Sequence, residues 1–260
     1  MTSVSSPREV NHFLAALTPA QRERLQPHLE LVALPAGAQL FNAGAPLRHV
    51  YFPNTAVISL VSSMRDGATM EVGVVGNEGV AGVCAFMGSR EALSSGVVLS
   101  AGHGWRIGTR AIGEQDRPSE ALMPPLLRYL QVLFTQIAQT SACNRHHAVE
   151  QQLCRWLLLN VDRLGSSELQ ATQERIACML GVRREGVTAG AGKLQSAGLI
   201  RYGRGRISIL DRKGLEQRSC ECYSVMRKAQ DRLLGMAVGT QDGHDERHAY
   251  AETSRQCQAA

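Results

Sequence analysis

The spacing of apolar residues changes near residue 120, and this change constrains the fold more than any other feature of the sequence. Before it, short apolar and β-branched runs alternate with turn residues. Ala56 to Val61 and Thr69 to Val75, for example, are separated by the turn signal Arg65-Asp66-Gly67. Short strands with this regular punctuation are typical of an antiparallel sandwich or barrel.

After the change, a long helix is predicted. Its apolar residues recur at spacings of three and four, which mark one face of an α-helix. Pro124 and Pro125 fit only the first turn, so the helix is predicted to run from there to near Asn144. The stripe contains Leu122, Leu126, Leu130, Leu133 and Ile137, and it is widened on one side by Leu127, Phe134 and Ala138. The stripe could pack on its own protein, but we favour a parallel homodimer seam made of Leu126, Leu130, Leu133 and Ile137.

Length and composition exclude several classes of protein. A chain of 260 residues suits two modest domains, and 44% hydrophobic residues are enough for a core. No apolar run approaches the roughly 18 residues that a membrane-spanning helix needs. The first 17 residues lack the apolar stretch of a secretory signal, and seven scattered cysteines do not resemble a disulfide framework. We therefore expect a cytoplasmic protein without membrane contact.

Positive charge is concentrated in one segment of the chain. From Thr172 to Lys213 there are nine basic and three acidic residues, an excess of +6 against +5 for the whole chain. A basic segment on an otherwise balanced protein indicates a polyanionic partner such as nucleic acid. The alternative is a merely solvated basic face, and only a motif in the same segment can decide between them.

That segment contains the spacing of a helix-turn-helix. A small residue, Ala177, is followed four positions later by Gly181 and six positions later again by the apolar Val187. Thr172 can cap the first of the two helices. The hairpin predicted over Ile200 to Leu210 then completes a winged variant of the motif.

The position of each residue within this motif indicates which contact with nucleic acid it is expected to make. The start of the second helix enters the major groove of DNA, where arginine can bond guanine and glutamate can accept from cytosine. The predicted base-reading residues are Arg183, Arg184 and Glu185. Phosphate contacts supply affinity rather than direct sequence reading. They are predicted for Thr172, Lys193, Arg201, Arg204 and Arg206. The predicted partner is double-stranded DNA, and a solvated helix end is the alternative for the arginines.

Between Glu150 and Tyr223 the chain contains RWLLLNVDRL, ERIACMLGVRREGVT, LQSAGLIRYGRGRISILDR and CECY. These stretches resemble the Crp/Fnr superfamily of bacterial transcription regulators. In the first half, LPAGAQLFNAGAPLRHVYFPNTAVISLV is similar to the opening strands of the family's cyclic-nucleotide-binding β-roll. The resemblance implies a homodimeric, sequence-specific regulator that contacts RNA polymerase. It also implies that Arg184 and Glu185 hold the main base-reading positions, whereas Ala189 replaces a third reading arginine.

The expected fold is α+β with four parts. A sensory antiparallel β-roll is predicted over residues 1–123 and a dimerisation helix over 124–145. A winged helix-turn-helix is predicted over 146–225, and a helix end with a disordered tail over 226–260.

The nucleotide pocket that the family resemblance implies departs from the family's pattern. Members that bind cyclic AMP have a Gly-Glu pair and, further on, an arginine followed by serine or threonine. Here Gly82 is followed by Val83, and no arginine precedes Ser94 and Ser95, because Arg90 is displaced. A phosphate without its arginine loses a charge-assisted pair worth about 1.5–3 kcal/mol. We therefore expect no response to cyclic AMP, and a pocket that binds another effector or none.

Other sites are not predicted. The family's iron–sulfur sensing uses cysteines near the N-terminus, and the first cysteine here is Cys84. Cys220 and Cys222 could form part of a metal or redox site, but a packed helix end is the favoured interpretation. Cys143 lies beside His146 and His147, where we favour a hinge over a metal. No catalytic motif is present, so neither an enzyme, a metal site nor a required cofactor is expected. The remaining alternative function is a redox or small-molecule receptor that acts through protein contacts.

Overall fold

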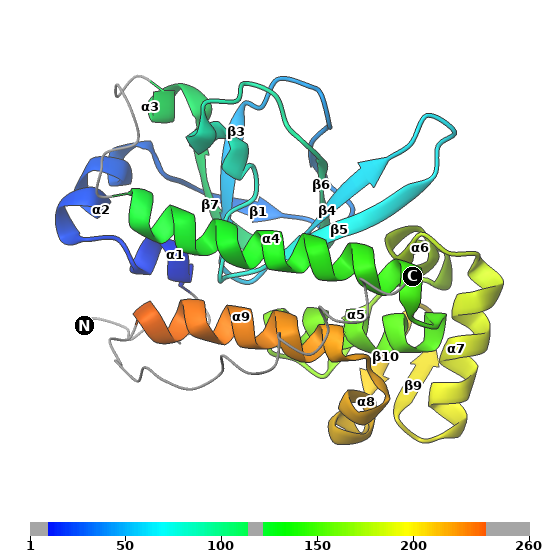
Figure 1. The fold of residues 1–260 in the computed structure, drawn as a ribbon. Coiled ribbons are helices and arrows are strands. Elements are labelled where there is room, and N and C mark those ends of the chain that lie inside the picture. Colours follow the sequence, from blue (N-terminus) through cyan, green and yellow to red (C-terminus); the bar gives the residue numbers. More distant parts are fainter. Residues whose placement is uncertain (1–9, 114–121, 238–260) are drawn as a thin grey trace, which may run out of the picture.

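The computed structural model describes residues 10–113 and 122–237, and its fold is α+β as predicted (Figure 1). The first half forms two antiparallel sheets, one with the order β1-β7-β3 and one with the order β2-β6-β4-β5. The strands of the first sheet are β1 (Glu30–Leu34), β7 (Gly102–Gly108) and β3 (His49–Pro53). Those of the second are β2 (Gln39–Phe41), β6 (Ser95–Ser100), β4 (Val57–Ser63) and β5 (Thr69–Val75). Short helices flank the strands: α1 (His12–Ala15), α2 (Pro19–Leu25), η1 (Gln26–His28), η2 (Val83–Met87) and α3 (Thr109–Gly113).

Aromatic side chains fill the interior of this β-roll and connect it to the following helix. Phe13 of α1 packs against Phe52 with ring centroids 6.0 Å apart, and against Tyr129 at 6.2 Å. Tyr129 is buried, and its hydroxyl donates to the carbonyl of Val80 at 2.8 Å. The long helix therefore completes the core of the roll.

That helix, α4 (Met123–His146), corrects the predicted dimer seam. Leu126 and Leu133 are 2% and 8% exposed and belong to the core of their own β-roll, while Leu130 and Ile137 are half-buried against the same core. The adjoining side of the helix carries Phe134, which is 63% exposed. The seam proposed on Leu126, Leu130, Leu133 and Ile137 is therefore wrong for its two buried leucines. Helical spacing identifies an apolar face, but it does not identify the surface that this face covers.

The second half is built around a buried helix, α5 (Val149–Leu164). Around it lie β8 (Glu168–Gln170), α6 (Gln173–Leu180), α7 (Arg184–Ser196), β9 (Ile200–Gly203), β10 (Arg206–Ile209) and α8 (Arg212–Arg218). The core of this half includes Trp156, Ile176 and Leu194, and it continues into the β-roll through Val57 and Val74. The helix-turn-helix region therefore packs directly on the strands of the first half.

The last described helix, α9 (Glu221–Ala237), runs back alongside α4 (Figure 1). The predicted boundary at residue 225 falls inside this helix. The tail predicted to be disordered beyond Val238 lies outside the described residues. Among the helices of residues 10–113 and 122–237, none is long and apolar enough to cross a membrane.

Candidate DNA-binding surface

The predicted helix-turn-helix is formed by α6 and α7. The side chain of Thr172 caps α6 and accepts a hydrogen bond from the amide of Arg175 at 3.2 Å. Gly181 ends α6 with a φ of 65°, and Val182 connects it to α7. The cap and the turn therefore lie at the positions predicted for them, and together they set the angle at which α7 leaves α6.

The two sides of α7 differ sharply in exposure. Val187, Ala191 and Leu194 are buried against the core. The middle of the outer side carries Glu185 and then the small residues Thr188, Ala189, Gly192 and Ser196, all exposed, while the exposed Lys193 and Gln195 flank it. A helix whose central outer positions are small can approach another surface closely.

The three predicted base-reading residues lie together at the start of α7. Arg183 is the N-cap residue, without a side-chain cap hydrogen bond, and Arg184 and Glu185 open the helix. All three are exposed. Among the described residues, neither arginine belongs to an ion pair that the structure records.

One polar contact beside them was not predicted from the sequence. The hydroxyl of Thr188 lies 2.7 Å from Oε1 of Gln173 on α6 and 3.0 Å from the carbonyl of Arg184. The first contact connects the outer side of α7 to the first turn of α6. Helical spacing could have indicated the contact with the Arg184 carbonyl, since Thr188 follows Arg184 by four residues and shares its side of the helix.

The wing turn lies next to the start of α6. Arg204 and Gly205 connect β9 to β10 with φ values of 51° and 74°, which is the left-handed pair that a two-residue hairpin turn requires. Among the described residues, Arg204 is the only non-glycine with a positive φ. The carbonyl of Gly205 accepts from the amide of Ala171 at 2.9 Å. The exposed residues Thr172 and Arg204 therefore lie close together in the structure.

The other predicted phosphate contacts differ in their present partners. Lys193 lies 3.6 Å from Glu150 and Arg206 lies 3.7 Å from Glu168, and both cations are more than half exposed. Such exposed pairs contribute little and can be exchanged for another anion. Arg201 is exposed on β9, and it is in no ion pair recorded for the described part of the chain.

Two cations of the basic segment point away from this surface. Arg175 donates to the carbonyl of Val98 on β6 at 2.7 Å, and burial lowers its pKa. Arg212 is paired with Asp162 at 2.6 Å. The excess of +6 therefore overstates the charge on the candidate surface, because a count of charges along the sequence does not show where each side chain points.

The residues predicted for the effector pocket lie beside closely packed side chains of the roll. Gly82 is the N-cap residue of η2, and a Cβ built on it would lie 3.2 Å from Leu47. The ring of Phe41 lies so close to Gly96 that a Cβ there would collide with it. Val83 follows Gly82 in η2, while Ser94 and Ser95 are half-buried, and Ser95 accepts from the amide of Ala43 at 3.1 Å.

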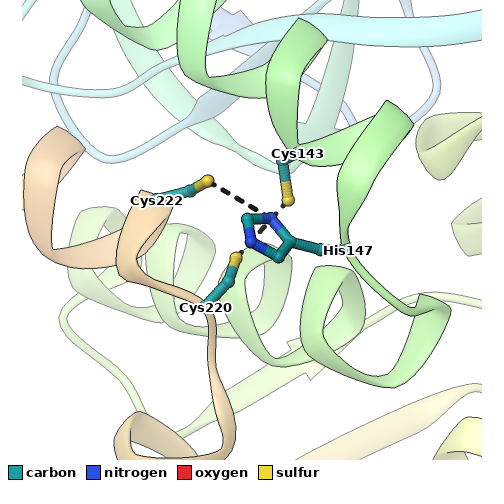
Figure 2. Close-up of side chains that lie close together, drawn as sticks. All are labelled: Cys143, His147, Cys220 and Cys222. Atoms are coloured by element: carbon teal, nitrogen blue, oxygen red, sulfur yellow. Dashed lines mark hydrogen bonds between the residues drawn. The ribbon is translucent and has the colours of Figure 1, made fainter. Parts of the chain in front are cut away.

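Sequence reasoning missed a cluster of four side chains. Cys143 and His147 at the end of α4 meet Cys220 and Cys222 at the start of α9 (Figure 2). Taken alone, Cys143 with His147 is typical of a hinge, and Cys220 with Cys222 is typical of a packed helix end. No metal site is expected from the sequence, because the two pairs lie far apart in it. No short-range signal connects the two pairs, because they meet only in the folded chain.

Comparisons with known proteins agree with this architecture. The family model of the Crp-like helix-turn-helix domain matches residues 151–218. A putative Crp/Fnr-family transcriptional regulator from Eubacterium rectale is 19% identical, with 78% of this chain and 94% of that chain covered and a TM-score of 0.63. A Crp/Fnr-family regulator from Thermus thermophilus is 22% identical, with 73% and 98% covered and a TM-score of 0.60.

A third solved structure, FixK2 from Bradyrhizobium japonicum, is 13% identical, with 74% and 98% covered and a TM-score of 0.61. No curated protein matches the sequence. The solved structures share the fold of this chain over about three quarters of its length, and the family model matches its helix-turn-helix region. The chain therefore shares the fold of these Crp/Fnr regulators, and its residues 151–218 match the Crp-like helix-turn-helix domain.

Proposed function

We propose that the chain is a homodimer that binds a specific DNA sequence and does so without cyclic AMP. The observation that carries this proposal is the exposed start of α7. There Arg183, Arg184 and Glu185 are all exposed, at the N-cap and in the first turn of the helix. As a transcription regulator, the protein would act in the cytoplasm and contact RNA polymerase.

The chemistry of α7 suits the major groove. An arginine bonds bidentately to O6 and N7 of guanine, and a glutamate accepts from N4 of cytosine. The small residues Ala189 and Gly192 allow the helix to enter the groove deeply. Arg204 at the wing turn and Thr172 at the cap of α6 are then positioned for phosphates, and Lys193, Arg201 and Arg206 add to them.

The exposed side of α4 supports a dimer on a different set of residues from the predicted seam. Leu127 and Phe134 are 56% and 63% exposed and stand one heptad apart, with Ala138 four residues further on the same side. Apolar residues at this spacing are typical of helices that pair along a seam. Two copies joined there would present two recognition helices, which requires a near-palindromic site with half-sites about one helical turn apart.

Close packing beside the predicted pocket supports independence from cyclic AMP. Phe41 and Leu47 are 8% and 4% exposed and lie against Gly96 and Gly82, the positions around which a nucleotide pocket would be built. The arginine that would hold the cyclic phosphate is also displaced, since Arg90 lies four residues before Ser94 rather than directly before it.

Selection of bound sequences from random DNA tests the proposal, with the full chain at physiological salt and with and without cyclic AMP. We expect a near-palindromic sequence to be enriched equally in both conditions. Enrichment only with cyclic AMP would contradict the independence from that nucleotide. Absence of any enriched sequence would contradict DNA recognition and favour a receptor that acts through protein contacts.

A further inference from the structure

Four side chains that ligate metals converge where α4 ends and α9 begins (Figure 2). Cys143 lies in the last turn of α4 and His147 directly follows that helix, four residues later and on the same side. Cys220 precedes α9 and Cys222 lies in its first turn. The four ligand atoms all lie within 4.8 Å of one another, although the two pairs come from distant parts of the sequence.

Two of the distances between these atoms are close to the edges of a tetrahedron around one ion. Sγ of Cys143 is 3.4 Å from Sγ of Cys220, and Sγ of Cys222 is 3.6 Å from Nδ1 of His147. Zinc–sulfur bonds of about 2.3 Å and zinc–nitrogen bonds of about 2.0 Å give tetrahedral edges of about 3.5–3.8 Å. The side chains therefore need only small shifts to surround the ion.

The surroundings suit a buried, charged metal complex. The three cysteines are 0–4% exposed and form a small cluster of their own, separate from both hydrophobic cores. Arg155 of α5 is also buried and acts on Cys143 through its positive charge. Three thiolates and Zn²⁺ carry one net negative charge, which this arginine offsets.

The histidine has the outer partner that a metal-bound imidazole usually has. Nε2 of His147 lies 3.3 Å from a carboxylate oxygen of Glu221, while Nδ1 faces the sulfurs. A carboxylate on the far nitrogen fixes the ring and its tautomer, and this arrangement recurs around zinc-ligating histidines. Glu221 stands between Cys220 and Cys222 in the sequence, so one short segment supplies two ligands and this support.

We propose that Cys143, His147, Cys220 and Cys222 bind one Zn²⁺ ion. Three thiols and one imidazole are a known set for structural zinc, and zinc prefers these soft ligands in tetrahedral geometry. Binding releases the three thiol protons to solvent and involves no oxidation or reduction. All four positions are supplied by protein, so the site is closed and has no place for a substrate.

Two other uses of the cluster fit the geometry less well. A disulfide between Cys143 and Cys220 would leave Cys222, His147 and the placement of Glu221 without a role. An iron–sulfur cluster holds its cysteines further apart, because an inorganic core lies between them. A mutual spread of 4.8 Å fits a single ion.

The position of the site gives the ion a structural role. It joins the end of α4 to the start of α9, directly beside Ala148, where the chain enters α5. The junction between the long helix and the helix-turn-helix region is therefore cross-linked by the metal. This role does not depend on which DNA sequence the protein binds.

Metal analysis of the full-length protein, purified under reducing conditions, tests the proposal. We expect one zinc per chain in the wild type and in Cys178→Ser, a control in which an exposed cysteine outside the cluster is changed. Cys220→Ser and Cys222→Ser should each lose most of the zinc. Folded wild-type protein without zinc that also takes up none when zinc is added would overturn the proposal.

Cobalt titration of the wild type gives a readout that does not depend on any variant folding. Wild-type apoprotein titrated with Co²⁺ should develop thiolate-to-cobalt charge-transfer bands and the intense visible bands of tetrahedral cobalt, saturating at one equivalent. His147→Ala should shift the visible bands, because one nitrogen ligand is lost. Weak octahedral bands, or a Cys143–Cys220 disulfide that forms in preference to metal binding, would contradict a four-ligand zinc site.

Discussion

Arg163 of α5 and Glu78 of the β-roll form a buried ion pair, with Nε and Oε1 2.7 Å apart and each side chain 3% exposed. The other oxygen of Glu78 accepts from the amide of Gly76 at 3.1 Å, and Arg163 also donates to the carbonyl of Leu159 at 2.9 Å. The pair therefore connects the roll to the helix that carries the DNA-binding region. Every rearrangement between the two halves has to keep or replace this contact.

Removal of one partner should be costly. We expect Glu78→Ala to lower the free energy of unfolding by about 3–5 kcal/mol, because it leaves the Arg163 charge buried without a partner. Urea denaturation measures the change. The matched control is Glu30→Ala, which removes the exposed Glu30–Arg106 pair at 2.9 Å and should cost no more than about 1 kcal/mol. Equal losses in the two variants would contradict the special role of the buried pair.

The pH dependence of stability should contain a contribution from Glu71. Burial raises the pKa of its carboxyl to about 7, despite the hydrogen bond from the Ser59 hydroxyl. The unfolded chain then ionises at lower pH than the folded one, so stability is lost as pH rises from about 4.5 to 7.

Glu71→Gln removes this loss and keeps an acceptor for Ser59. We expect the variant to gain stability relative to the wild type as pH rises, by at most about 3 kcal/mol above pH 7. Denaturation curves of both proteins at several pH values give the difference directly. A constant difference from pH 5 to 8 would show that Glu71 does not titrate in this range.

Substitutions on the two sides of α4 should have opposite consequences. Phe134→Glu places a charge on the exposed side and should yield a folded monomer, because it disrupts only the proposed dimer surface. Leu133→Glu buries an unpaired carboxylate in the roll and should cost several kcal/mol of fold stability. Light scattering and thermal melting separate the two effects. A Phe134→Glu protein that remains dimeric at low concentration would place the dimer surface elsewhere.

The winged helix-turn-helix could be predicted because its signals are local. The cap at Thr172, the turn at Gly181 and the apolar Val187 are specified within a few residues of the structure that they form. The direction of the α4 stripe could not be predicted, since Leu126 is apolar whether it meets its own roll or a second chain. The metal-ligand cluster is still less accessible from sequence, because Cys143 and Cys220 meet only after α9 has packed along α4.

The comparison of Arg184→Ala with Arg204→Ala in salt-titrated DNA binding tests the account most directly. Arg184, at the start of α7, should read a base edge. Its loss should cost roughly 1–3 kcal/mol on the preferred site and relax discrimination at one position in each half-site. Arg204, at the wing turn, should contact phosphate. Its loss should weaken preferred and random DNA about equally and reduce the slope of affinity against log salt by about one unit. If Arg204→Ala changes the preferred sequence while Arg184→Ala only lowers overall affinity, α7 is not the recognition helix.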